Sequence, residues 1–210
     1  MRIYASLSVI FFGVFSLHAQ PATKALSILM EGNKRYVESQ TVCHEDWTAQ
    51  RAALTEGQAP FAIIVSCSDS RVPPEIIFDQ TLGSLFVVRV AGNIVDDFAI
   101  GSIEYGVNVL GAKLILVLGH ANCGAVDAAL KGLKFDNHIQ EVLKAIEPAI
   151  GSMKDGNDSS LEKAIKANVL HVEEMLRKSK PVLAKAIKKK SVELYGGYYD
   201  LKSGRVELLQ

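Results

Sequence analysis

Three short, mostly apolar runs alternate with longer amphipathic segments in the middle of the chain. The runs are residues 61–65, 85–90 and 113–118. A strand that is covered by helices on both faces has such a continuous apolar pattern, whereas a strand with one exposed face alternates between apolar and polar residues. The three runs therefore predict parallel strands inside a sheet.

Helical spacing of apolar residues, together with Gly and Pro punctuation, predicts the elements between and after these strands. The predicted helices cover 22–38, 47–54, 75–78, 97–110, 124–130, 136–150, 161–178 and 181–189. Two alternating segments, 192–199 and 205–209, predict a hairpin or two edge strands. The fold class that follows is α/β: a central, mostly parallel β-sheet flanked by helices, with an N-terminal helical arm and C-terminal edge strands.

The first 19 residues have a different pattern. Arg2 precedes a mainly apolar stretch at 3–17, and the small residue Ala19 follows it. This is the pattern of a secretory signal peptide, so we expect cleavage after Ala19 and a single domain at 20–210. The apolar stretch is shorter than the roughly 20 residues of a spanning helix. We therefore favour a periplasmic or secreted protein with no stable membrane insertion after cleavage over an uncleaved anchor.

Composition and charge exclude several classes of protein. A length of 210 residues, of which 49% are hydrophobic, suits one domain with a buried core and argues against disorder. Lys plus Arg and Asp plus Glu both number 23, and no basic block is interleaved with aromatic residues. We expect no binding to nucleic acid. The basic cluster at 185–190 is interpreted as a solvated helix end, where cations are favoured.

Residues that carry chemistry follow the first and third predicted strands. Cys67, Asp69 and Arg71 come after the first strand, and His120 and Cys123 come after the third. Ligands of such sheets bind beyond the carboxyl ends of the strands. Thiolates and imidazoles are preferred ligands of zinc, and a catalytic zinc site uses three protein ligands and leaves one position open. Cys67, His120 and Cys123 supply such a set.

Two other interpretations use the same residues. A disulfide between Cys67 and Cys123 would suit an exported protein, but it would not require ligands or proton carriers beside each cysteine. We therefore favour a metal site, and Cys43 is left as a bystander. A closed structural zinc site could take Asp69 as its fourth ligand, but Arg71 would have no purpose in it.

In a catalytic site, Asp69 and Arg71 have a task. Two thiolates cancel the charge of zinc, so that its water is less acidic than on a three-histidine zinc. Asp69 can accept a hydrogen bond from this water, while Arg71 keeps the carboxylate ionised. Without Arg71, Asp69 would become a fourth zinc ligand in an inactive state.

The segments Cys-Ser-Asp-Ser-Arg-Val at 67–72 and Gly-His-Ala-Asn-Cys-Gly at 119–124 closely resemble the β-class carbonic anhydrases, and the match spans about 58–124. The resemblance implies a zinc-dependent enzyme that hydrates carbon dioxide reversibly to bicarbonate and a proton by a zinc-bound hydroxide. Together with the predicted signal peptide, it indicates an exported bacterial member of the family. It implies Cys67, His120 and Cys123 as zinc ligands and Asp69 and Arg71 as a catalytic dyad. The expected substrate pocket consists of Gln58, Phe86, Ala91, Tyr105 and Gly124.

The resemblance also implies a homodimer or homotetramer. The apolar face of the helix at 22–38, which has no evident place on the sheet, favours an oligomer as well. Two rival functions stay open on the same residues. One is the hydrolysis of carbonyl sulfide or carbon disulfide, and the other is binding of zinc or bicarbonate without catalysis.

Overall fold

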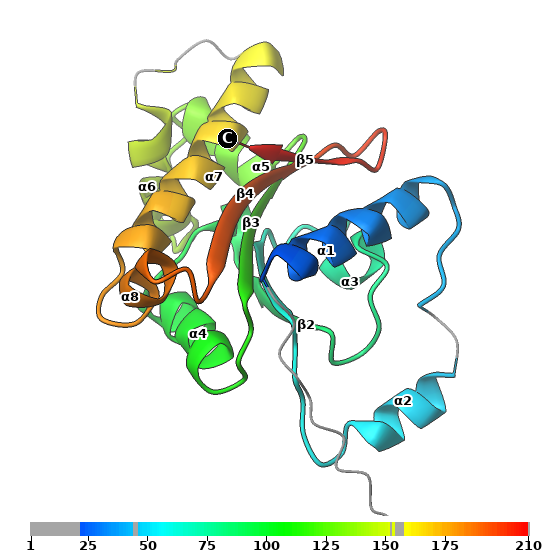
Figure 1. The fold of residues 1–210 in the computed structure, drawn as a ribbon. Coiled ribbons are helices and arrows are strands. Elements are labelled where there is room, and N and C mark those ends of the chain that lie inside the picture. Colours follow the sequence, from blue (N-terminus) through cyan, green and yellow to red (C-terminus); the bar gives the residue numbers. More distant parts are fainter. Residues whose placement is uncertain (1–21, 44–45, 152, 154–157, 210) are drawn as a thin grey trace, which may run out of the picture.

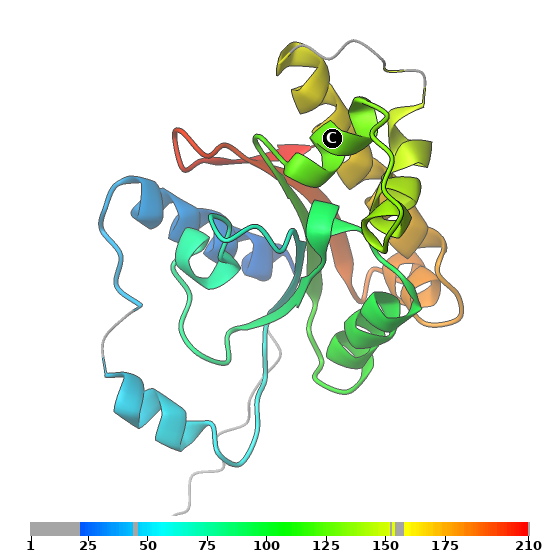
Figure 2. The same ribbon diagram turned by 180° about the vertical axis from the view of Figure 1, so that it is seen from behind.

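A five-stranded sheet with helices on both faces forms the body of the protein (Figures 1 and 2). The computed structural model describes residues 22–43, 46–151, 153 and 158–209, so that the predicted signal peptide lies outside the described residues. The strand order is β2-β1-β3-β4-β5. The strands are β1 (Ala62–Ser66), β2 (Leu85–Arg89), β3 (Leu114–His120), β4 (Glu193–Tyr199) and β5 (Val206–Leu209). Only the β4–β5 pair is antiparallel within the described part, which confirms the predicted fold class.

The helices form two layers that differ in size. Helices α4 to α8 cover one face of the sheet, and α1 and α3 lie on the other (Figures 1 and 2). The bounds are α1 (Ala22–Val37), α2 (Trp47–Ala53), α3 (Pro74–Ile77), the 3-10 turn η1 (Ala91–Asn93), α4 (Asp97–Asn108), α5 (Gly124–Leu130), α6 (Ile139–Ile150), α7 (Asp158–Lys178) and α8 (Leu183–Lys188). Among the described residues, no helix combines the length and apolarity needed to cross a membrane.

The two central strands are buried along their whole length, as their apolar sequences require. Every residue of β1 and β3 is buried. Ile63 and Ile115 pack into the core beneath α4 and α7, whereas Ile64 and Leu116 pack into the core beneath α1 and α3. Because full burial of one such side chain contributes about 1.5–3 kcal/mol, the register of these strands is strongly determined.

Helix α1 packs against the sheet, which corrects the sequence-based interpretation of its apolar face. Ala25 and Leu29 are fully buried in the same core as Leu116. The buried amide of Asn33 donates to the carbonyl oxygen of Gly204 and accepts from the amide of Val206. The helix is thus held by residues that lie more than 170 positions away from Asn33 in the sequence. Local periodicity cannot predict such a contact. Its apolar face gives no argument for an oligomer.

Cys43, which has no evident partner in the sequence, belongs to a buried group of hydrogen bonds around Asp79. This group, called the anchor below, joins the end of α1 to the end of α3. The carboxylate of Asp79 is inaccessible to solvent and accepts from the guanidinium of Arg35 and from the amides of Val42 and Cys43. The thiol of Cys43 donates to the carbonyl oxygen of Asp79. Burial would raise the pKa of Asp79, but these donors outweigh it and hold the pKa below its usual range.

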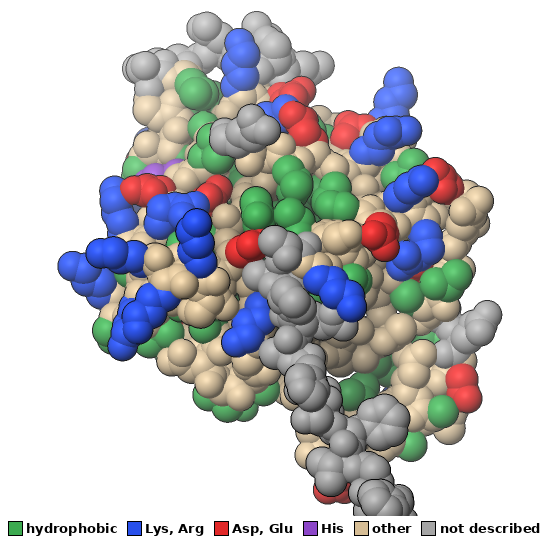
Figure 3. Space-filling model, viewed as in Figure 1, with side chains coloured by type: hydrophobic (Ala, Val, Ile, Leu, Met, Phe, Trp, Pro, Cys, Tyr) green, Lys and Arg blue, Asp and Glu red, His purple; other side chains and the backbone are tan. Residues whose placement is uncertain are grey.

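The basic cluster at the end of α8 is solvated, as predicted. Lys185, Lys188, Lys189 and Lys190 are all exposed, and α8 ends at Lys188. Lysine and arginine side chains gather over α8 and the end of α7 (Figure 3). This position is electrostatically favourable because the last carbonyl groups of a helix carry partial negative charge.

Candidate metal centre and active site

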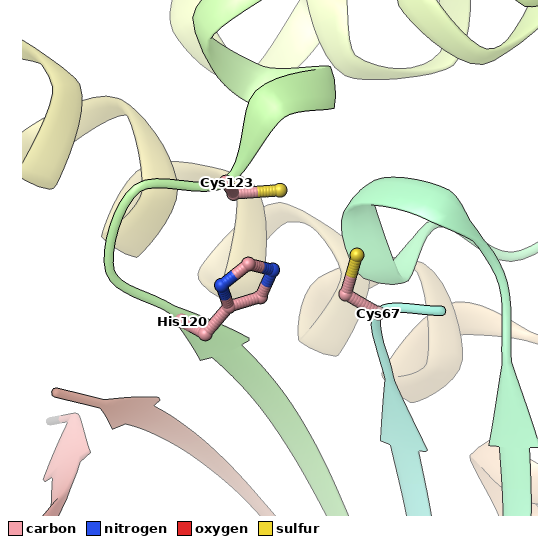
Figure 4. A group of neighbouring side chains, drawn as sticks. All are labelled: Cys67, His120 and Cys123. Carbon is pink, nitrogen blue, oxygen red and sulfur yellow. The ribbon is translucent and has the colours of Figure 1, made fainter. Parts of the chain in front are cut away.

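Three potential metal ligands meet where β1 and β3 end. Ser66 of β1 pairs with Leu118 of β3, so that Cys67, directly after β1, lies beside the end of β3 at His120. Cys123 is the residue before α5. The three side chains point toward one another, and their ligand atoms lie within 4.8 Å of each other (Figure 4). They form a buried group that could hold a metal ion.

The ring of His120 is oriented for metal binding. Its Nδ1 lies 2.9 Å from the carbonyl oxygen of Ala121, to which it can donate a hydrogen bond. Its Nε2 is buried and has no hydrogen-bond partner in the part of the chain that the structure describes. Buried polar atoms are seldom left in this way. A ring nitrogen whose opposite N–H is fixed by a backbone carbonyl is typical of a histidine ligand, and two thiols beside it fit zinc.

The two thiols of the group are free and electrostatically coupled. Hydrogen bonding from the thiol of Cys123 lowers the pKa of Cys67, although burial opposes this shift. The same interaction raises the pKa of Cys123. The amide of Gly92 also donates to the sulfur of Cys67 at 3.3 Å. The two thiols thus share a proton, and binding of a metal cation would replace it.

Arg89, the last residue of β2, shapes the loop that carries Cys67 and Asp69. Its guanidinium donates through Nε to the carbonyl oxygen of Cys67 at 2.9 Å and through Nη2 to that of Asp69. The predicted set of site residues did not include Arg89. The sequence signal that could have indicated Arg89 is a positive charge at the carboxyl end of the otherwise apolar β2, which pairs with β1.

Asp69 and Arg71 form a bidentate ion pair next to the three ligands. The Nε and Nη2 atoms of Arg71 lie 2.9 and 2.7 Å from the two carboxylate oxygens, and the amide of Arg71 donates to Oδ1 as well. Arg71 thereby holds the pKa of Asp69 well below its usual range. Oδ2 of Asp69 is 3.9 Å from Nε2 of His120. The side chain of Asp69 is 17% exposed and that of Arg71 is 53% exposed, so the pair connects the ligand group with solvent.

Two of the five predicted pocket residues lie beside the ligand group. Ala91 begins the η1 turn, whose Gly92 contacts the sulfur of Cys67. Gly124 follows Cys123 directly and is exposed. Both are small residues, and a Cβ atom on Gly124 would meet no atom within 4 Å. Their role in binding substrate stays a prediction.

The other three predicted pocket residues lie toward the opposite end of the strands. Gln58 precedes β1, whose five residues span about 16 Å before Cys67 is reached. Phe86 pairs with Ile63, which is four residues, or about 13 Å, before Cys67. The rings of Phe86 and Tyr105 are 6.2 Å apart. Within one chain, the structure therefore does not bring Gln58, Phe86 and Tyr105 to the ligand group.

Comparisons with known proteins agree with this geometry. The family model described as "Carbonic anhydrase" matches residues 62–206. A carbonic anhydrase of Mycolicibacterium smegmatis is 37% identical over 191 residues, which cover 88% of this chain and 91% of the relative. The structure of a β-carbonic anhydrase of Coccomyxa, solved with acetazolamide, superposes with a TM-score of 0.71 at 28% identity and covers 88% of this chain and 86% of the other. The chain belongs to the β-class carbonic anhydrase family.

Other members of the family give the same result. Carbonic anhydrase 2 of Mycobacterium tuberculosis is 37% identical over 188 residues and covers 88% of this chain and 91% of the relative. One of two tetrameric β-carbonic anhydrases of Sordaria macrospora superposes with a TM-score of 0.71 at 25% identity and covers 89% of this chain and 97% of the other. The predicted enzyme class, a carbonic anhydrase of the lyases, is confirmed.

Proposed function

We propose that this β-class carbonic anhydrase hydrates carbon dioxide reversibly at a Zn²⁺ ion held by Cys67, His120 and Cys123. The observation that carries the proposal is the buried Nε2 of His120, which has no hydrogen-bond partner among the described residues. It lies beside two thiols and 3.9 Å from the carboxylate of Asp69. Zinc, when bound, supplies a Lewis acid that makes water nucleophilic near neutral pH. The remaining tasks belong to side chains of this chain.

Asp69 would orient the reacting water and pass on its proton. Both carboxylate oxygens are engaged by Arg71, and the low pKa of Asp69 makes it a weak base. We infer that Asp69 accepts a hydrogen bond from water without retaining the proton. Because Asp69 is partly exposed, the proton can pass from its carboxylate to solvent water, while Arg71 stays protonated throughout. Arg71 also keeps Asp69 from becoming a metal ligand, which would give the inactive state.

A second copy of the chain would complete the substrate pocket. The β2 strand is at the edge of the sheet, and no residue of α2 is buried. Phe98 on α4 is 87% exposed, which is unusual for a large aromatic side chain. We propose a homodimer, or a homotetramer built from it, in which Gln58, Phe86 and Tyr105 lie near the metal centre of a neighbouring subunit. Sedimentation velocity should show a dimer or tetramer, and a monomer alone would contradict this proposal.

Stopped-flow measurement of carbon dioxide hydration between pH 7 and 9 tests the activity. The purified enzyme should accelerate the reaction, a zinc chelator should abolish the acceleration, and added Zn²⁺ should restore it. Hydrolysis of carbonyl sulfide or carbon disulfide without hydration of carbon dioxide would favour the rival reaction. Stoichiometric zinc without any of these activities would indicate a protein that only binds.

We also propose that the enzyme is exported to the periplasm or secreted. The support is the order of Arg2, the apolar stretch 3–17 and Ala19. Intact-mass measurement of the protein isolated from its native cells should show a mature chain that begins at Gln20. Retention of residues 1–19 in a cytosolic fraction would contradict export.

A further inference from the structure

Asn168 is a buried polar residue in the middle of α7, on the face that packs against the sheet. Its side chain is inaccessible to solvent and lies between the buried apolar residues Ile165, Val169 and Val172. Nδ2 donates to the carbonyl oxygen of Gly92 at 2.8 Å, and Oδ1 has no partner among the described residues. A buried amide with an unmet hydrogen bond is destabilising compared with an apolar side chain of its size. Its presence requires a reason beyond the stability of the fold.

Gly92 links Asn168 to the metal centre. Its carbonyl oxygen accepts from Asn168, while its amide donates to the sulfur of Cys67 at 3.3 Å. Gly92 and Asn93 both have positive φ angles, of 69° and 46°, and such a backbone needs support from its surroundings.

Apolar contacts beside Asn168 also attach α7 to the sheet. A Cβ atom on Gly119 of β3 would lie only 2.6 Å from a methyl group of Val169, so that α7 and β3 are already in close contact through apolar atoms. Val169 and Val172 are buried in the same core as Ile115. The hydrogen bond of Asn168 therefore orients the η1 turn relative to α7.

We propose that Asn168 is a positioning residue of the metal centre, acting through Gly92. It holds the peptide groups around Gly92 so that the N–H points at the sulfur of Cys67. An N–H···S hydrogen bond withdraws electron density from a thiolate and fixes its direction, both of which tune the bound metal. The inference rests on the proposed role of Cys67 as a zinc ligand.

The test compares Asn168→Leu, which removes the donor at similar volume, with Val172→Ala, a core truncation one turn later on α7. The dissociation constant of Zn²⁺ is measured by competition with a chromophoric chelator, starting from the zinc-loaded protein. The sulfur-to-metal charge-transfer band is measured after substitution with Co²⁺. In Asn168→Leu, zinc affinity should fall about 10- to 100-fold, the usual effect of losing an outer contact of a metal site. The charge-transfer band should move to lower energy because the thiolate becomes more electron-rich.

Val172→Ala should lower the unfolding midpoint and leave zinc affinity and the cobalt band unchanged. Asn168→Ala adds no bulk and serves as a second variant if Asn168→Leu does not fold. The inference is overturned if every Asn168 variant that folds keeps its zinc affinity within twofold of the wild-type value and its cobalt charge-transfer band at the wild-type energy. Failure of the wild-type protein to bind zinc would refute the proposed function instead, and the two results are thus distinguishable.

Discussion

Replacement of Cys67 with Ser should remove zinc from the enzyme and reduce carbon dioxide hydration to the uncatalysed rate. A serine hydroxyl is not deprotonated near neutral pH, so that His120 and Cys123 alone would face the metal. The loss should be nearly complete because a thiolate ligand contributes both a strong bond and the charge that balances zinc. The zinc content per chain is measured by inductively coupled plasma mass spectrometry, and the hydration rate is measured by stopped flow.

Cys43→Ser is the matched control for this variant. Cys43 is also a buried free thiol, but its partner is Asp79 in the anchor between α1 and α3. The control should keep one zinc per chain and the wild-type rate, with lower stability. Full zinc content in Cys67→Ser would show that Cys67 is not a ligand and would refute the proposed metal centre.

Asp69→Asn should keep zinc and lower the hydration rate by about 10²- to 10⁴-fold, the usual contribution of a positioned proton acceptor. The amide has the shape of the carboxylate but lacks its charge, so that it cannot form the bidentate pair with Arg71. Asp69 is not among the three residues whose ligand atoms converge. Zinc content and kcat are measured on the same preparation.

Asp127→Asn is the control for Asp69→Asn, since Asp127 forms a surface ion pair with Lys131 on α5. It should leave both zinc content and rate unchanged. Loss of zinc in Asp69→Asn would favour a closed structural site with Asp69 as a ligand. An unchanged rate would show that the dyad has no part in catalysis.

The pH profile of the carbon dioxide hydration rate should show no change between pH 5 and 9 that is due to titration of Asp69. Arg71 depresses the pKa of Asp69 in the folded protein below the value of about 3.9 in an unfolded chain. The pair therefore contributes to stability above pH 3.9, and this contribution is lost as the pH falls toward the lower, folded pKa. The pKa of Asp79, beside Arg35, is also lowered, so its contribution to stability is likewise lost as the pH falls.

The fold could be predicted because local pattern and tertiary structure agree. The apolar runs at 61–65, 85–90 and 113–118 became β1, β2 and β3, and their parallel order follows from the helices between them. Placement of α1 could not be predicted in this way. Its site on the sheet includes Gly204 and Val206, and no local periodicity connects these residues with Asn33.

Some features of the candidate site could likewise be predicted from the sequence, and others could not. Sequence alone determined the donor chemistry of Cys67, His120 and Cys123, since ligand preference is a property of residue type and parallel strands end at one edge. Tertiary structure decided the surroundings: Arg89 holds the loop of Cys67, Asn168 holds the turn of Gly92, and Phe86 lies far from the candidate ligand group of its own chain. These relations join segments that are distant along the chain. They depend on packing geometry, which a one-dimensional pattern of polar and apolar residues does not contain.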